Sequence, residues 1–245
     1  MSDLTEKLRV EVWSDVVCPF CYIGKRNYEA ALAKFEHPEE VVLEFRAFQL
    51  DPNMTQDPNK KTDLREHLAH KYGRSLPEAD AMLQQMAGTA KNAGLTFNFD
   101  TAVRFNTYQA HRIAQIAKEK GLGNEFEEAL FAAYFTNGID LGSAEKLRQV
   151  AASVGLCDAD LEAALNDETY AAMVDQDLRE AASIGISGVP FFLFNKKYAV
   201  SGAQPPEVFL EALNAAYNDW KRSEAPEIKA VSAGSSCDIG GNCDR

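Results

Sequence analysis

Cysteine is scarce in this sequence, with five residues among 245. That number is too small for a scaffold held together by disulfides, so cysteines that lie close together are better candidates for catalysis or metal binding. Long apolar runs are missing too, because no stretch approaches the roughly 18 residues that a membrane-spanning helix needs. These two absences exclude a disulfide-rich scaffold and an integral membrane protein.

Basic residues are outnumbered, 25 Lys and Arg against 37 Asp and Glu, which gives a net charge of -12. Such a chain repels phosphates, so neither nucleic acid nor an anionic membrane is expected as its main partner. The opening "MSDLTEKLRV" has no basic region followed by an apolar one, as a secretory signal would. A cytoplasmic protein is therefore expected, although a secreted chain that has lost its signal would look the same.

The hydrophobic fraction of 46% is ordinary for a globular protein with a sizeable core. Alternating apolar residues in "KLRVEVWSDVV" predict a strand, and helical spacing after Pro19 predicts a helix that ends before His37. Residues 41–50, "VVLEFRAFQL", predict a second strand. Strand, helix and strand within about 45 residues indicate a right-handed βαβ unit with parallel strands.

Between residues 63 and 184 the composition shifts to Ala, Gln and Glu with a period near 3.6, which predicts an all-α segment. Asn124, Ser143 or Asp158 can cap a helix there, and Pro77 suits a first turn. Strand character returns in "VPFFLFNKKYAVSG", which predicts a hairpin, and "PEVFLEALNAAYNDWKR" predicts a closing helix. The strands at the two ends of the chain are expected to share one sheet around the helical insertion.

A Cys-x-x-Cys pair, Cys18 and Cys21, lies where the first strand ends and the first helix begins. Unpaired amides and the helix dipole at that place favour an anion, here a thiolate, which is the nucleophile of disulfide exchange. Pro19 fits the first turn, and Cys21 lies on the same helical face as Cys18. One cysteine can attack a partner disulfide and the other can resolve the mixed intermediate.

Two other interpretations of the cysteines stay open. The pair could be core thiols without a role, or Cys18, Cys21, Cys237 and Cys243 could supply four sulfurs to zinc in a metal-held or redox-sensing binding protein. The position of the first pair at a helix start within a βαβ pattern, and the wide spacing of the tail pair, argue against zinc. No metal is therefore expected.

The chain resembles the DsbA family of thiol–disulfide oxidoreductases in the thioredoxin superfamily, and its FrnE-like branch in particular. The segments that carry the resemblance are, in order, "SDVVCPFCYIGKR", "FQLDP", "NTYQAHR", "GISGVPFFLFN" and "YAVSGAQPPE". They span roughly residues 8–220. The resemblance implies an α/β protein with a thioredoxin fold and a large all-α domain inserted between its βαβ and ββα halves. The expected divisions are 1–53, 54–184, 185–222 and a tail at 223–245.

The resemblance also implies the roles of the site residues. Cys18 would be the attacking thiol and Cys21 the resolving one, and the Val189–Pro190 bond would be cis beside them. Val189 would then turn its backbone towards an extended substrate peptide. Phe20 stands where the FrnE-like branch often has tryptophan and keeps an apolar face beside Cys18.

The expected activity is protein thiol–disulfide oxidoreductase or disulfide isomerase chemistry, with no bound cofactor. The expected partners are proteins with thiols or disulfides, and a redox partner protein or a low-molecular-weight thiol. A second enzyme interpretation comes from the same fold, because glutathione-dependent 2-hydroxychromene-2-carboxylate isomerases and kappa-class glutathione transferases resemble this architecture. Those enzymes typically have serine where this chain has its cysteine pair, which argues against them here.

Several other residues have both a functional and an ordinary interpretation. Asp15 could relay a proton to Cys21, but an Asp there more often turns or caps the strand end. Trp13 is expected in the core, and Lys25 and Arg26 on an exposed face. His111 is expected to pack or to face solvent rather than to act as a base.

The remaining cysteines lie away from the first pair in the sequence. Cys157 has no near partner and is expected to be a buried structural cysteine. Cys237 and Cys243 enclose "DIGGN", whose glycines allow the tail to fold back and join them. Because the linker from Trp220 is long enough to reach Cys18, the tail pair is a candidate for exchange with Cys18 and Cys21 or for a regulatory disulfide of its own.

Overall fold

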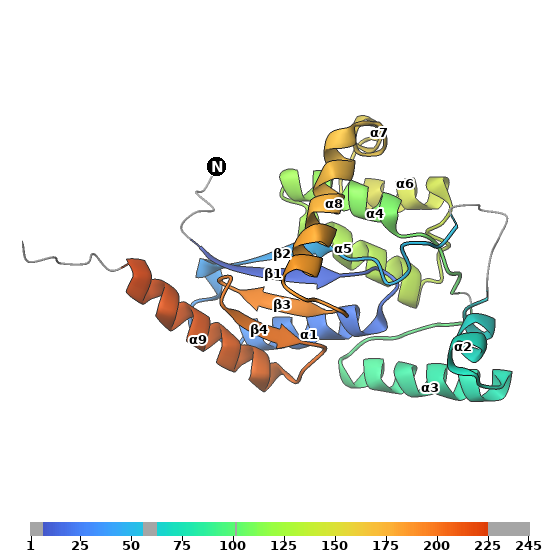
Figure 1. The fold of residues 1–245 in the computed structure, drawn as a ribbon, viewed down its shortest axis with the longest axis horizontal. Helices are drawn as coiled ribbons and strands as arrows, with labels where there is room; N and C mark the ends of the chain where they lie inside the picture. Colours follow the sequence, from blue (N-terminus) through green and yellow to red (C-terminus); the bar gives the residue numbers. More distant parts are fainter. Residues whose placement is uncertain (1–6, 56–62, 101, 225–245) are drawn as a thin grey trace, which may run out of the picture.

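The computed structural model describes residues 7–55, 63–100 and 102–224. Its centre is a four-stranded sheet in the order β2-β1-β3-β4 (Figure 1). The strands span Leu8–Ser14 (β1), Val41–Ala47 (β2), Phe191–Phe194 (β3) and Tyr198–Ser201 (β4). β1 and β2 are parallel, as the βαβ pattern predicts, and β3 pairs antiparallel with both β1 and β4. The two ends of the chain therefore form one sheet.

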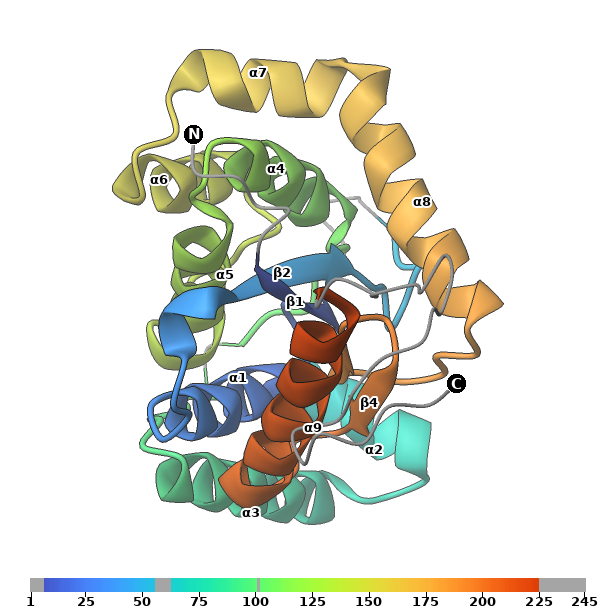
Figure 2. The same ribbon diagram turned by 90° about the vertical axis from the view of Figure 1, so that its left-hand side faces the viewer.

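Helices cover both faces of this sheet (Figures 1 and 2). The helices of the described residues are α1 (Pro19–Leu32), η2 (Pro38–Glu40), α2 (Leu64–Tyr72), α3 (Leu76–Asn92), α4 (Tyr108–Glu119), α5 (Gly123–Phe131), η3 (Ala132–Thr136), α6 (Ala144–Ser153), α7 (Asp158–Asn166), α8 (Glu168–Ser183) and α9 (Pro206–Glu224). The helices α2 to α8 fall within the segment whose composition predicts an all-α insert. The structure thus has a thioredoxin-like sheet interrupted by a helical region.

Alternate residues of β1 face two different cores. Leu8, Val10 and Val12 pack with α1 and α9. On the other face, Trp13 is fully buried against Ala181 of α8, which confirms its expected place in the core. The insert covers this second face, so β1 is buried on both faces of the sheet. Many antiparallel strands, by contrast, have one face exposed to solvent.

The observed helix starts test the capping residues that the sequence predicts. Ser143 caps α6 by accepting a hydrogen bond from the amide of Lys146, as predicted. The predicted caps Asn124 and Asp158 are wrong, because α5 begins at Gly123 and α7 begins at Asp158, so both residues lie inside the helices. Cys157 occupies the cap position of α7, and its backbone amide donates a hydrogen bond to the Asp160 carboxylate.

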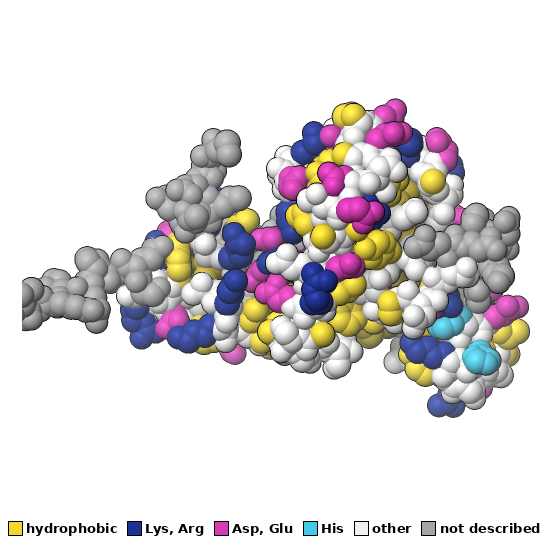
Figure 3. All heavy atoms as spheres, turned by 45° about the horizontal axis from the view of Figure 1, so that its top comes forward, with side chains coloured by type: hydrophobic (Ala, Val, Ile, Leu, Met, Phe, Trp, Pro, Cys, Tyr) yellow, Lys and Arg dark blue, Asp and Glu magenta, His cyan; other side chains and the backbone are white. Residues whose placement is uncertain are grey.

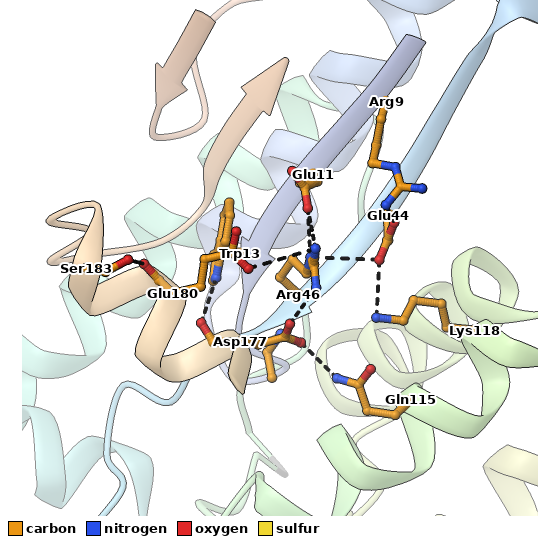
Figure 4. Close-up of polar contacts among 11 residues, drawn as sticks. Arg9, Glu11, Trp13, Glu44, Arg46, Gln115, Lys118, Asp177, Glu180 and Ser183 are labelled. Atoms are coloured by element: carbon orange, nitrogen blue, oxygen red, sulfur yellow. Dashed lines mark hydrogen bonds and ion pairs between the residues drawn. The ribbon is translucent and has the colours of Figure 1, made fainter. Parts of the chain in front are cut away.

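An ionic cluster joins the sheet to the insert at Arg46 of β2 (Figure 4). The guanidinium donates to Glu11 of β1 and, through Nη1, to Oδ1 of Asp177 in α8 at 2.8 Å. The other oxygen of Asp177 accepts hydrogen bonds from the amide of Ala47 at 3.0 Å and from Gln115 Nε2 of α4 at 2.8 Å. Asp177 therefore connects β2, α4 and α8, and this cluster fixes the insert against the sheet.

Replacing Asp177 with alanine is expected to lower the free energy of unfolding by about 3–5 kcal/mol, because it removes one of the carboxylates that pair with Arg46 and leaves the Ala47 amide and Gln115 Nε2 without their buried acceptor. Urea denaturation measures this loss. Asp219→Ala is the matched control, since Asp219 pairs with Lys197 at 2.7 Å on the exposed side of α9. That variant is expected to lose no more than about 1 kcal/mol. Equal losses of unfolding free energy in the two variants would contradict the role of Asp177 in fixing the insert to the sheet.

Candidate active site

Cys18 occupies the cap position at the start of α1, directly after the loop that follows β1. Its amide donates to the Asp15 carbonyl at 3.0 Å, and Pro19 fills the first helical position without needing a partner for a backbone N–H. The sulfur therefore lies at the positive end of a 14-residue helix. This is the position from which the sequence predicts a reactive thiolate.

The loop before β3 lies against Cys18. The Cys18 thiol donates to the Val189 carbonyl at 3.4 Å, and the Val189–Pro190 bond is cis, as the resemblance implies. Gly24 of α1 lets this loop approach closely, because a Cβ at that position would come within 3.0 Å of the Pro190 ring. Residues more than 160 positions apart in the sequence are thus in contact at one site.

Cys21 lies one turn further into α1 and is 2% exposed. Burial raises the pKa of the Cys21 thiol, and the hydrogen bond and charge of Cys18 raise it further. The nearby Ser14 hydroxyl and the backbone of Asp15 oppose this rise in part, because they favour the thiolate. Cys21 therefore holds its proton more tightly than an ordinary cysteine. Both cysteines are free thiols in this structure.

The surroundings of the pair are asymmetric. Cys18 and Pro190 are buried, Val189 is half-buried, and Phe20 is 44% exposed. Phe20 thus offers an apolar surface beside Cys18, as expected. Cys18 and Cys21 belong to the same hydrophobic cluster as Val16 before α1 and the inner faces of the insert helices. The dithiol consequently lies at the junction of the sheet and the insert.

Charged residues of α1 hold that helix against α5. Lys25, only 5% exposed, pairs with the Glu128 carboxylate at 2.7 Å, and Arg26 pairs with the same carboxylate. Tyr22 donates to Glu128 Oε1 at 2.6 Å. Burial would raise the pKa of Glu128, but these three donors together lower it. The expectation of an exposed face was wrong for Lys25, because α5 of the insert packs over it.

A second polar group lies on the inner side of the site. Asp15, His111 of α4 and Glu127 of α5 are 1%, 2% and 3% exposed. His111 Nε2 lies 3.5 Å from Asp15 Oδ1, and the other oxygen of Asp15 accepts the amide of Leu50 at 2.8 Å. Asp15 therefore holds the loop, as its ordinary interpretation predicts, and also faces a buried histidine. Glu127 was missed in the sequence because it resembles any polar residue of an amphipathic helix.

The buried carboxyl and imidazole groups have shifted acidities. Burial raises the pKa of Glu127 to about 7, and the Asp15 charge adds to that shift while His111, Lys25 and Lys118 oppose it. Burial by itself would lower the pKa of His111. Hydrogen bonding and charge from Asp15, with the charge of Glu127, outweigh burial, so the pKa of His111 is raised.

The remaining predictions concern Cys157, the tail cysteines and metal binding. Cys157 is exposed at the cap position of α7, so its expected burial was wrong. Cys237 and Cys243 lie outside the described residues. Within those residues, the only group of three or more potential metal ligands is formed by His37, Glu39 and Glu40, and Lys221 already pairs with Glu40 at 2.5 Å.

The family model for DSBA-like thioredoxin domains matches residues 9–214, which is most of the chain. The chain belongs to this DsbA-like family. A probable DsbA oxidoreductase of Streptomyces coelicolor, SCO1869, is 35% identical, with a TM-score of 0.81 over 97% of this chain and 99% of its own. The chain is thus a DsbA-like disulfide oxidoreductase with the predicted α/β thioredoxin fold. Membership of the FrnE-like branch stays a prediction.

Two more distant proteins are also similar to this DsbA-like chain. YwbO of Bacillus subtilis is 28% identical over 214 residues, which cover 84% of this chain and 96% of YwbO. The cytosolic disulfide reductase DsbM of Pseudomonas aeruginosa is 17% identical, with a TM-score of 0.60 over 86% of this chain and 99% of DsbM. At that identity, the likeness to DsbM shows the fold alone.

The acidity of Glu127 predicts how stability depends on pH. A carboxyl whose pKa is raised in the folded state stabilises the fold below the unfolded value of 4.5, and this contribution is lost as pH rises towards 7. Glutamine does not ionise, so the free energy of unfolding of Glu127→Gln should lack this decline. Relative to wild type, the free energy of unfolding of the variant should therefore rise between pH 4.5 and 8, by up to about 3 kcal/mol.

Urea denaturation across that pH range measures the gain. Glu125→Gln is the control, because Glu125 lies on the same helix and is exposed. A constant difference between Glu127→Gln and wild type from pH 4.5 to 8 would contradict the raised pKa.

Proposed function

We propose that the chain exchanges dithiols and disulfides with protein substrates through Cys18 and Cys21. Supporting this is the position of Cys18, which has the start of α1 on one side and the Val189 carbonyl at 3.4 Å on the other. A substrate sulfur would approach beside Phe20, which is 44% exposed, and Val189, since Cys18 and Cys21 are themselves only 4% and 2% exposed. Cys18 is therefore the attacking sulfur and Cys21 the resolving one.

Substrate recognition in this proposal involves the backbone at Val189. Its amide and carbonyl precede Pro190 and β3, so they can pair with an extended peptide whose sulfur reaches Cys18. Phe20 would contact apolar side chains of that peptide. Main-chain pairing carries little sequence information, so broad selectivity among unfolded or extended proteins is expected.

The single substitutions Cys18→Ser and Cys21→Ser test the roles of the two sulfurs. Cys18→Ser is expected to lower the rate of insulin reduction at least about a hundredfold, because it removes the nucleophile. Cys21→Ser should instead accumulate a mixed disulfide at Cys18 that mass spectrometry detects. Cys157→Ser is the control and should keep the wild-type rate. Equal reduction rates in wild type and Cys18→Ser would rule out this mechanism.

The tail pair adds a proposal that rests on the sequence alone. We expect Cys237 and Cys243 to exchange with the Cys18–Cys21 pair or to form a regulatory disulfide. The double variant Cys237→Ser/Cys243→Ser should then shift the equilibrium redox potential or the turnover of insulin reduction. Unchanged values for both would leave the tail pair without a redox role.

Glutathione is a second candidate substrate, because DsbM, whose fold this chain shares, has also been solved with GSH. As a low-molecular-weight thiol, glutathione could reduce the Cys18–Cys21 disulfide. The glutathione-dependent isomerase and transferase alternatives would instead require glutathione binding that survives the loss of both cysteines. Titration of glutathione into the Cys18→Ser/Cys21→Ser variant distinguishes these possibilities.

Localisation stays a proposal, with a cytoplasmic site as the expectation. Within the three described ranges, no helix combines the length and apolarity needed to cross a bilayer. On the face shown in Figure 3, basic and acidic side chains are interspersed over the helical region. A surface of this kind favours protein partners over nucleic acid or an anionic membrane, in keeping with the net charge of -12.

A further inference from the structure

The loop that carries Val189 begins at the end of α8, the last helix of the insert (Figure 1). Its sequence "IGISGVP", residues 184–190, contains two glycines, and Gly185 has a positive φ of 78°. Within the loop Ile186 and Pro190 are buried and Val189 is half-buried, whereas the other four residues are exposed. A loop of this composition has much conformational freedom of its own, so its shape depends on the contacts of these three residues.

Trp13 of β1 packs against both ends of this loop. It is the largest fully buried side chain of the described residues, and it forms one hydrophobic cluster with Ala181 of α8 and Ile186 of the loop. Val189 and Phe191 pack against this Trp13 cluster, and the Trp13 and Phe191 rings meet edge to face with their centroids 6.4 Å apart. The cluster therefore supports the loop from where it leaves α8 to where it enters β3.

The indole of Trp13 also fixes the helix from which the loop departs. Its Nε1 donates a hydrogen bond to the Asp177 carbonyl of α8 at 3.0 Å (Figure 4). The side chain of Asp177 pairs with Arg46 of β2 at 2.8 Å, so the same turn of α8 is held from β1 and from β2. The Ile186 amide donates to the Ala181 carbonyl at 2.9 Å, which ties the loop to the end of that helix. The loop thus has a defined position relative to β1.

Val189 connects the Trp13 cluster to the cysteine pair. Its side chain packs against the Trp13 cluster and also against the cluster that contains Cys18 and Cys21. Among the described residues, Val189 is the one that packs against both clusters. Its carbonyl accepts the Cys18 thiol at 3.4 Å. A change at Trp13 therefore reaches the site through the Val189 backbone.

We propose that Trp13 is a positioning residue for substrate binding, which together with Ile186 holds the Val189 backbone in place before an extended peptide pairs with it. This inference rests on the proposed function. A loop that is ordered only when the peptide binds subtracts the cost of that ordering from the affinity, whereas a loop already held in place does not. Because Trp13 is fully buried, it contacts no substrate. Its effect is expected only on substrates that have a peptide backbone to pair.

Two activated disulfides with the same reacting atoms separate backbone binding from thiol chemistry. One is the mixed disulfide of N-acetylcysteine with thionitrobenzoate, and the other has this disulfide on the central cysteine of a short uncharged peptide. The Cys18 thiolate attacks the cysteine sulfur of either reagent, the S–S bond of the reagent breaks, and coloured thionitrobenzoate leaves as a thiolate. The ratio of the two second-order rate constants, peptide over N-acetylcysteine, measures what the peptide backbone contributes.

The background protein keeps Cys18 as its only cysteine, so each reaction stops at this first release, and its substitutions are Cys21→Ser, Cys157→Ser, Cys237→Ser and Cys243→Ser. Trp13→Phe removes the indole N–H and part of the packing. Ile186→Val removes a single methylene from the loop side of the cluster, a change that buried sites tolerate. Trp220→Phe is the matched control, because this other tryptophan of the chain is buried in the separate core formed with α1 and α9.

The ratio is expected to fall about three- to tenfold in Trp13→Phe, the equivalent of one main-chain hydrogen bond, and about threefold in Ile186→Val. The N-acetylcysteine rate constant should change by no more than about twofold in either variant, since it reports only the reactivity of Cys18. Trp220→Phe should match the background in both rate constants.

An unchanged ratio in folded Trp13→Phe and Ile186→Val would overturn the inference, and so would equal falls of both rate constants, which indicate a general loss of structure. Ile186→Val decides the matter alone if Trp13→Phe does not fold. A background protein that reacts no faster with the peptide than with N-acetylcysteine would remove the backbone pairing on which the inference rests. Release of thionitrobenzoate that survives Cys18→Ser would defeat the proposed function itself.

Discussion

The structure depends on the meeting of two distant chain segments at the start of α1. The Cys18 sulfur lies within 3.4 Å of the Val189 carbonyl, although 171 positions separate them. Antiparallel pairing of β1 with β3 brings the loops together, and the missing side chain of Gly24 lets the Pro190 ring pack against the helix. The Cys18 thiol and the Val189 backbone thereby become neighbours.

The helical insert contributes to the site as well as to the fold. Through Asp177 it is fixed to the sheet, and through Glu128 it holds α1 by way of Lys25 and Arg26. The insert also covers the inner side of the cysteine pair, and the burial of Cys21 raises the pKa of its thiol. In the proposed exchange, Cys18 meets the substrate while Cys21 keeps its proton until resolution.

Much of the fold was predictable because its signals are local. Strand alternation, the Pro19 start of α1 and the hairpin turn at Asn195 and Lys196, both with positive φ, depend on neighbouring residues only. The burial of Lys25 and Glu11 was not predictable, because it depends on which helix packs over each side chain. The exposure of Cys157 was not predictable either, because it also depends on tertiary packing.

The sequence by itself determined the family, the parallel pairing of the first two strands, the closing hairpin and the candidate pair Cys18 and Cys21, since a helix start with two thiols at that spacing is a local property. Only the tertiary structure decided the surroundings of Cys21. His111 and Glu127 lie on separate helices, and a carboxyl becomes a buried acid with a pKa of about 7 only when packing removes its water. Acidity of that kind depends on three-dimensional burial, which no single segment encodes.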